Sequence, residues 1–250
     1  MSSSLAVVIM AAGKGTRMRN PEFAKVMYTV GDMPMVEHVA RLALGLHAEH
    51  TIVVVGWQKD TVVHHLAKTV PSAVCVEQTP QLGTGHAVLQ TERVLEVFEG
   101  DVLVLSGDVP LLRAATVESL VKAHRSTEAD ATVLTTILDD ATGYGRIVRD
   151  ENGRVTGIVE QKDASKEQLR IREINTGIYV FRRNSLFDGL MHITPDNSQK
   201  EYYLTDVFRY YWKNDLPVSA VVCHDPLEVR GVNTLAQLKE AREAFASRGS

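Results

Sequence analysis

Short, continuously apolar segments alternate with segments of helical periodicity through the first half of the chain. Strands that are apolar along their whole length are typical of a parallel sheet that helices cover on both faces. The alternation therefore predicts an α/β fold with a Rossmann-like, doubly wound sheet and a ligand site at the carboxyl ends of the strands. The expected strands are Ala6–Met10, Thr51–Val55, Ala73–Val76 and Val102–Ser106, and the expected helical faces contain Met35, Val39, Leu42 and Leu46, then Val62, Val63 and Leu66, then Ala87, Val88, Leu95 and Phe98.

The second half of the chain is richer in strand-like segments and has no internal repeat or low-complexity linker. We therefore expect a single domain over residues 1–250, with one lobe over about 1–112, a smaller β-rich lobe over about 113–233 and a closing helix over about 234–250. The turn sequence DENG between two β-rich arms predicts a hairpin over Ile147–Glu160. The other expected elements are strands over Ala131–Leu138, Thr176–Phe181 and Val218–Cys223 and helices over Leu204–Lys213 and Thr234–Phe245.

The overall composition disfavours several classes of protein. The 250 residues are 44% hydrophobic and 23% charged, as in a globular domain, and the net charge of -4 disfavours nucleic acid or an acidic membrane surface as a partner. Cys75 and Cys223 lie in apolar segments, so we expect neither a disulfide framework nor a zinc cluster. The sequence has no signal-peptide pattern and no run of the ~18 apolar residues that a membrane span needs, so a cytoplasmic location is expected.

The first expected strand runs directly into AAGKGTRM, residues 11–18, which is a candidate phosphate-binding loop. A glycine-rich turn after a strand exposes backbone N–H groups to an anion, and Gly13 and Gly15 let the backbone approach it closely. Lys14 and Arg17 add positive charge, and an arginine can bind phosphate oxygens through two donors. The spacing matches neither the Walker loop nor the G-x-G-x-x-G dinucleotide fingerprint, and an ordinary strand-to-helix turn with solvated charges is the alternative.

Further motifs follow this loop in order along nearly the whole chain. Together they resemble the nucleotide-diphospho-sugar pyrophosphorylases and, more narrowly, the uridylyltransferase domain of the bacterial bifunctional N-acetylglucosamine-1-phosphate uridylyltransferase/glucosamine-1-phosphate acetyltransferase family. A single motif of this kind is weak, whereas the ordered set is specific. The motifs are GDMPMVEHV (31–39), EQTPQLGTGHAV (77–88), LSGDVPLL (105–112), TGYGRIV (142–148), VTGIVEQKDA (155–164), REINTGIYVF (172–181), QKEYYLTDVF (199–208) and VRGVNTLAQL (229–238).

The resemblance implies a reaction in which UTP and N-acetylglucosamine 1-phosphate give UDP-N-acetylglucosamine and pyrophosphate. A phosphate oxygen of the sugar phosphate attacks the α-phosphorus in line, so that positioning and charge neutralisation carry the catalysis. By resemblance, Gln78 meets the donor–acceptor edge of uracil and Gly83 lets the base lie against the backbone. The implied catalytic residues are Arg17, Lys25 and Asp108, and the implied nucleotide-binding residues are Met10, Ala11, Ala12, Gly13, Lys14, Gly15, Gln78, Gly83, Thr84 and Gly107.

The resemblance also implies a Mg²⁺ ion and a sugar pocket. Asp108 and Asn233 would hold the ion, because Mg²⁺ takes oxygen ligands that it shares with phosphates and water. Taken singly, the residues of both sites are also consistent with ordinary surface, turn, hairpin and sheet-edge positions. The implied sugar-binding residues are Gly145, Glu160, Asn175, Tyr203 and Thr205.

The sequence departs from the family pattern at two positions and in length. Ala24 stands where proline usually precedes the lysine, so Lys25 is expected to be held less rigidly. Ser106 replaces an aromatic residue often found before Gly-Asp, which affects one sugar-side contact. The hexapeptide-repeat domain that carries acetyl transfer and forms the trimer in the bifunctional relatives is absent from the sequence, so a monomer or weak dimer is expected. Two rival functions remain: a pyrophosphorylase for glucose 1-phosphate with UTP or dTTP, and a non-catalytic sensor of UDP-sugars.

Overall fold

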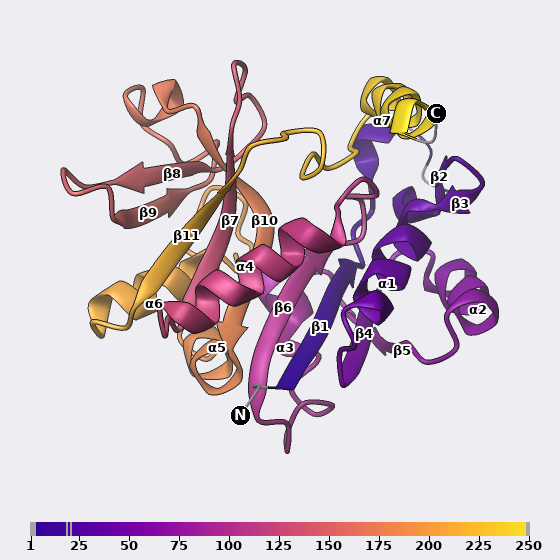
Figure 1. The fold of residues 1–250 in the computed structure, drawn as a ribbon, viewed down its shortest axis with the longest axis horizontal. Helices are drawn as coiled ribbons and strands as arrows, with labels where there is room; N and C mark the ends of the chain where they lie inside the picture. The colour runs from indigo at the N-terminus through magenta and orange to yellow at the C-terminus, as the bar shows by residue number, and fades with distance from the viewer. Residues whose placement is uncertain (1–3, 19, 21, 249–250) are drawn as a thin grey trace.

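A nine-stranded sheet forms the centre of the computed structural model, which describes residues 4–18, 20 and 22–248 (Figure 1). Its main path has the order β11-β7-β10-β6-β1-β4-β5. Every pair along this path is parallel except the two that β10 makes, so the predicted doubly wound, mostly parallel sheet is confirmed. These strands are β1 (Ser4–Ala11), β4 (His50–Val55), β5 (Val74–Glu77), β6 (Gly100–Ser106), β7 (Ala131–Ile137), β10 (Glu173–Arg182) and β11 (Val218–Cys223).

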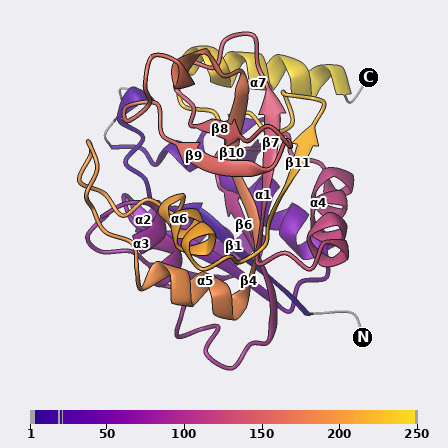
Figure 2. The same ribbon diagram turned by 90° about the vertical axis from the view of Figure 1, so that its left-hand side faces the viewer.

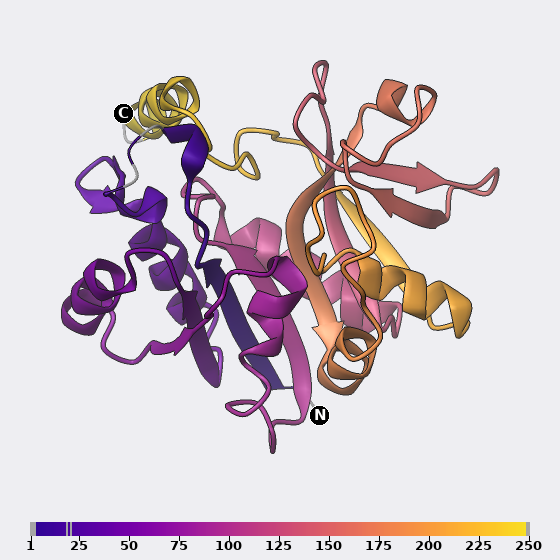
Figure 3. The ribbon, with the colours of Figure 1, turned by 180° about the vertical axis from the view of Figure 1, so that it is seen from behind.

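Helices cover both faces of the sheet because successive residues of a strand point to opposite sides. In β1, Val7 and Ile9 pack on the side of α1, α2 and α4, whereas Ala6 and Val8 pack on the side of α3, α5 and α6 (Figures 1 and 3). All four side chains are fully buried, which explains why the segment is apolar throughout. The helices are α1 (Met35–Gly45), α2 (Lys59–Thr69), α3 (Thr84–Leu89), α4 (Ala114–Ser126), α5 (Arg183–Leu190) and α6 (Asp206–Lys213).

The third expected helix is shorter than its apolar spacing predicted. After α3 ends at Leu89, the chain continues in turns, yet Leu95 and Phe98 are still buried against the sheet. Apolar residues at helical spacing can therefore be buried from a series of turns, and periodicity alone does not distinguish the two. Val63 also differs from the expectation, because it lies on an exposed side of α2.

Two further features lie beside the main sheet. The expected hairpin is present as β8 (Arg146–Arg149) and β9 (Val155–Val159), and β8 joins it to β10 (Figure 2). The last helix, α7 (Leu235–Arg248), returns to the small ribbon of β2 (Thr29–Val30) and β3 (Met33–Pro34) (Figure 1). The chain therefore ends against its first lobe. In the described ranges, no helix is long and apolar enough to cross a bilayer.

Candidate active site

A cavity of about 470 Å³ opens at the carboxyl ends of β1, β5 and β6, the edge of the sheet where the strand pattern predicted a ligand site. Parallel strands bring their following loops to this edge, so residues that are distant in the sequence meet there. The cavity is lined by Met10, Ala11, Ala12, Gly13, Lys14, Gly15, Thr16, Lys25, Val26, Gln78, Gln81, Gly83, Thr84, Ala87, Ser106, Asp108 and Glu201.

The two glycines of the candidate phosphate loop have different surroundings. A Cβ added at Gly13 would meet no protein atom within 4 Å, so this position borders open space. Gly15 has a φ of +60°, and a Cβ there would lie 2.5 Å from Cβ of Lys25. Glycine is therefore needed at position 15 so that the Lys25 side chain can pack against it. Gly13 instead leaves open space beside the loop backbone. The Lys14 ammonium lies 5.4 Å from the centre of the Trp57 ring, a cation–π contact at the rim of the cavity.

Four of the predicted site residues form one network. The Lys25 ammonium pairs with the Asp108 carboxylate and donates to Asn233 Oδ1 at 2.9 Å. Arg17 donates to the same amide oxygen at 2.8 Å. The side chains of Lys25 and Asp108 are each 14% exposed, which is inconsistent with a solvated surface lysine. The structure therefore brings together one carboxylate, one amide oxygen and two cations from three distant parts of the chain.

Backbone contacts hold the oxygen-bearing members of this network in place. Val232 N donates to Asp108 O at 2.9 Å, which ties the segment carrying Asn233 to the end of β6. Gly231 lies beside both residues, because a Cβ there would be 3.4 Å from Asp108 Oδ1 and 3.4 Å from Asn233 Nδ2. The sequence analysis missed Gly231, although a glycine two positions before Asn233 was visible in VRGVN.

The backbone at Ala24 resembles what proline would impose. Ala24 is 2% exposed and has φ -62° and ψ 124°, close to the φ of about -65° that a proline ring fixes. Lys25 then begins a short 3₁₀ helix and is held by Gly15, Asp108 and Asn233. These tertiary contacts supply a constraint that alanine at position 24 lacks, and the expectation of a less rigid lysine stays a prediction.

The residues predicted to recognise uracil are already bonded to one another or to the backbone. Gln78 is 3% exposed; its amide nitrogen donates to Gly83 O at 2.9 Å and lies 3.1 Å from His86 Nδ1. Gly83 has a φ of +117°, and a Cβ there would lie 2.6 Å from Tyr202 O. The Thr84 hydroxyl accepts a bond from the backbone of residue 204 at 3.0 Å. Through these contacts, Gln78, Gly83 and Thr84 are held in one wall of the cavity. Burial lowers the pKa of His86, which favours its neutral ring.

The predicted sugar-binding residues gather where β8, β9 and β10 meet. A Cβ at Gly145 would lie 3.3 Å from Glu160 Oε1 and 3.5 Å from Asn175 Cβ, so glycine makes this close approach possible. Asn175 donates through its amide to the Tyr179 hydroxyl at 2.7 Å, and Thr205 Oγ1 lies 3.5 Å from Glu160 Oε1. Tyr203 is buried, and its hydroxyl accepts from Gln199 at 2.6 Å.

Burial dominates the electrostatics of this second cluster. Burial raises the pKa of Glu160, the hydrogen bond from Thr205 lowers it, and the charges of Asp163 and Asp206 raise it further. Glu160 is therefore a partly buried acceptor instead of a solvated charge at a sheet edge.

Ser106 ends β6 and Gly107 follows it, and the two residues lie against β10 and β1, respectively. Gly107 N donates to Met10 O at 2.9 Å, and a Cβ at Gly107 would lie 3.2 Å from that oxygen. Ser106 lines the cavity, and its hydroxyl oxygen is 3.3 Å from where a Cβ at Gly177 would be. A bulkier residue at 106 would face this tight contact with β10.

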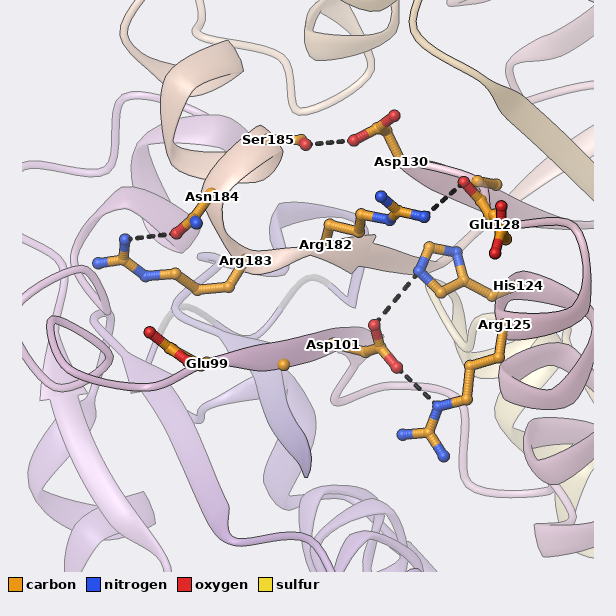
Figure 4. A pocket seen from close by; sticks show the side chains of 12 residues that line it. Glu99, Asp101, His124, Arg125, Glu128, Asp130, Arg182, Arg183, Asn184 and Ser185 are labelled. Atoms are coloured by element: carbon orange, nitrogen blue, oxygen red, sulfur yellow. Dashed lines mark hydrogen bonds and ion pairs between the residues drawn. The ribbon is translucent and has the colours of Figure 1, made fainter. Parts of the chain in front are cut away.

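A larger cavity, of about 780 Å³, lies at the opposite edge of the sheet (Figure 4). Asp101, at the start of β6, accepts from Arg125 Nε at 2.7 Å and lies 3.6 Å from His124 Nε2. Ser185 donates to Asp130, and Arg182 donates to Glu128 O at 2.7 Å. Its buried acids are thus bonded to neighbouring protein groups.

Comparisons with known proteins show the family to which the chain belongs. The family model described as Nucleotidyl transferase matches residues 6–226. The chain is 46% identical over 237 residues to the bifunctional protein GlmU of Geobacter metallireducens, covering 95% of this chain and 49% of that protein. It is 45% identical over 248 residues to the bifunctional protein GlmU of Clavibacter sepedonicus, covering 99% and 50%. The chain therefore spans about half the length of the curated relatives it matches.

Solved structures share the fold at low sequence identity. A UDP-glucose pyrophosphorylase complexed with UDP-glucose superposes with a TM-score of 0.77 at 17% identity, covering 99% of this chain and 100% of that chain. A putative glucose-1-phosphate thymidylyltransferase from Bacillus anthracis gives 0.76 at 18% identity, covering 97% and 95%. These similarities support the fold.

Proposed function

Because the chain belongs to the nucleotidyl transferase family, we propose that it transfers a uridylyl group from UTP to N-acetylglucosamine 1-phosphate. The products are UDP-N-acetylglucosamine and pyrophosphate. The observation that carries the proposal is the network of Lys25, Asp108 and Asn233 beside the glycine loop. Further support comes from the ordered motifs and from structural neighbours named as UDP-glucose pyrophosphorylases.

Catalysis rests on positioning and charge neutralisation. A sugar-phosphate oxygen forms a bond to the α-phosphorus of UTP while the bond to pyrophosphate breaks, so negative charge moves to the leaving group. Lys25 and Arg17 donate to Asn233 Oδ1 in the free protein and can donate to phosphate oxygens when the nucleotide fills the cavity. The open space beside Gly13 leaves the loop backbone accessible to the nucleotide.

Asp108 and Asn233 are the residues that would hold Mg²⁺. Their oxygens converge on a cation in the free protein, the Lys25 ammonium, and a carboxylate with an amide oxygen suits a hard divalent ion. Within the described ranges, no group of three or more histidine, cysteine or acidic side chains could hold a metal by itself. When bound, the ion supplies positive charge to phosphate oxygens.

The sugar would occupy the cluster at Gly145, Glu160 and Asn175, so that the β-rich lobe over about 113–233 binds the sugar and the lobe over about 1–112 binds the nucleotide. Glu160 and Asn175 are suited to sugar hydroxyls, and the Gly145 N–H to the carbonyl of the acetamido group. In the described hydrogen bonds this N–H has no acceptor, whereas Gly145 O accepts from Asn175 N at 2.9 Å.

Pyrophosphate release tests the proposal directly. Purified protein with UTP, Mg²⁺ and N-acetylglucosamine 1-phosphate is expected to release pyrophosphate, and glucose 1-phosphate is expected to be the poorer acceptor. A preference for glucose 1-phosphate or for dTTP would replace the substrate assignment. Binding of UDP-N-acetylglucosamine without any turnover would support the sensor and refute the enzyme.

A further inference from the structure

A buried arginine lies directly beside the proposed sugar-binding glycine. Arg146 is the first residue of β8 and is 3% exposed. Its Nη1 donates to Tyr144 O, and its Nε is buried without a hydrogen-bond partner in the described part of the chain. No carboxylate of the described residues lies within ion-pair distance of it. The charge of Asp140 acts on Arg146 without a direct ion pair. A buried guanidinium with no bonded carboxylate costs stability, so packing alone does not account for arginine here.

The contact from Arg146 holds the Tyr144 carbonyl, for which no backbone donor is found among the described residues. Tyr144 N donates to Ala141 O at 3.2 Å, and Gly145 O accepts from Asn175 N at 2.9 Å. The Tyr144 carbonyl is held by the Arg146 side chain instead. Arg146 therefore completes the set of bonds that hold the peptide plane between residues 144 and 145.

That peptide plane also carries the Gly145 N–H. In a planar trans peptide the C=O and the N–H point in opposite directions, so a bond that holds the carbonyl also aims the N–H. The Gly145 N–H has no acceptor among the described residues and belongs to the residue that lies against Glu160 and Asn175. Because arginine reaches back from the next position, the donor is oriented before any ligand arrives.

We propose that Arg146 is a positioning residue that aims the Gly145 N–H at the acetamido carbonyl and thereby sets the preference for N-acetylglucosamine 1-phosphate over glucose 1-phosphate. The inference rests on the proposed function and deepens it. Arg146 acts through the peptide and does not touch the substrate. Glucose 1-phosphate has no acetamido carbonyl, so its turnover does not depend on this alignment.

Substituting Arg146→Met tests the proposal, because methionine fills similar space and removes the donor. The kcat/KM for N-acetylglucosamine 1-phosphate is expected to fall about tenfold, the worth of one well-aligned hydrogen bond, mainly through KM. The value for glucose 1-phosphate is expected to stay unchanged. Arg146→Lys, which retains a donor, is expected to recover part of the selectivity. An equal loss for both sugars, or no loss, overturns the proposal.

Arg149→Met is the matched control on the same strand. It removes the contacts of Arg149 to Glu173 and to Gly153 O and leaves the Tyr144 peptide untouched, so the ratio of the two sugars should not change. If the ratio changes equally in this control, Arg146 has no specific role.

Backbone ¹⁵N relaxation of Gly145 in the free protein gives a readout apart from turnover. The Gly145 amide is expected to be ordered in the wild type and in Arg146→Lys and to gain motion in Arg146→Met. Unchanged order in Arg146→Met refutes the positioning role even if the enzyme is active. If the wild type does not prefer the acetamido sugar, the substrate assignment is refuted, and the selectivity role of Arg146 is refuted with it. The relaxation measurement still decides independently whether Arg146 holds the peptide.

Discussion

Strand β6 ends in one cavity and begins in another, and the two cavities differ in how their charges are satisfied. Asp108, just after β6, shares its surroundings with two cations and an amide oxygen beside open space. Asp101, near the start of β6, is bonded to Arg125 and faces His124, and the other buried acid of its cavity is bonded to a serine (Figure 4). The cavity at the start of β6 has the larger volume of the two, about 780 Å³. Its buried acids nevertheless already have protein partners.

The difference teaches that volume does not identify the site. At the carboxyl edge, loops that follow parallel strands present cations and backbone donors to a common space, as a phosphate ligand requires. At the amino edge, opposite charges neutralise one another and hold α4 against the sheet. The predictions below test whether charges at the first edge serve catalysis and charges at the second serve stability.

The largest expected difference is between Asp108→Asn and Asp101→Asn. Replacing Asp108 removes the only carboxylate of the catalytic network, and kcat/KM for pyrophosphate release should fall more than ~100-fold, as for loss of one strong transition-state contact. Asp101→Asn should leave the rate per folded molecule nearly unchanged. Equal rates for the two variants at matched folded fractions would remove the distinction between the cavities.

Arg17→Ala should affect turnover more than product binding. We expect Arg17 to face the phosphates that leave as pyrophosphate, so the rate from UTP should fall about tenfold to a hundredfold, the worth of one charge-assisted hydrogen bond. Affinity for UDP-N-acetylglucosamine, measured by titration calorimetry, should change little. Arg183→Ala at the amino edge, which loses a bond of 3.0 Å to Leu95 O, is the control and should keep full turnover.

Asp101→Asn should lower the free energy of unfolding at pH 7 by about 1–3 kcal/mol, because it removes the carboxylate charge that faces Arg125 and the buried His124. Burial raises the pKa of Asp101, but its contacts with His124 and Arg125 outweigh burial and hold the pKa below its usual value. The folded state thus favours the carboxylate, and the stabilisation is complete above the unfolded value of about 3.9. It is lost as the pH falls through the lower folded-state pKa.

Urea unfolding of both proteins between neutral and strongly acidic pH measures this effect. The gap between wild type and Asp101→Asn should be constant above about pH 5 and close in acid. A gap that stays constant throughout would show that the carboxylate charge contributes nothing at this edge.

Glu160 should make sugar binding pH-dependent. Burial raises its pKa, so the carboxylate form is lost at a higher pH than for an exposed glutamate. The KM for the sugar phosphate should therefore rise as the pH falls, by at most about tenfold per pH unit below that pKa. Glu160→Gln should give a KM that varies less with pH, and an unchanged profile would assign the titration to another group.

The smallest expected effect is that of Gly13→Ala. Its Cβ meets no protein atom, so stability should be unchanged, while UTP and UDP-sugar binding weaken about two- to tenfold, the worth of one backbone hydrogen bond. Gly100→Ala at the amino edge is the contrast, because its Cβ would lie 2.3 Å from Ser4 O. That variant should lose stability without a change in nucleotide affinity per folded molecule.

Local sequence patterns predicted most of the fold. The continuously apolar segments were confirmed as strands β1, β4, β5 and β6. Strands β1, β4 and β6 are buried on both faces, as an apolar segment predicts, whereas β5 lies at the edge of the sheet and Val74 is exposed. The antiparallel direction of β10 was not predicted, because an apolar segment has the same pattern in either direction. The extent of α3 was overestimated for a related reason: burial depends on where side chains end, and turns can place them as a helix does.

The sequence by itself therefore determined which segments are buried, where the glycine loop follows a strand and which family the motifs resemble. Only the tertiary structure decided that Lys25 and Asp108, 83 positions apart, share an ion pair and that Asn233 completes it. It also decided that Gly15 seats a lysine while Gly13 borders open space, and that Arg146 holds the peptide before Gly145. The physical reason is that burial and backbone preference are local properties of a chain, whereas a contact between distant side chains exists only once packing has set their distance and direction.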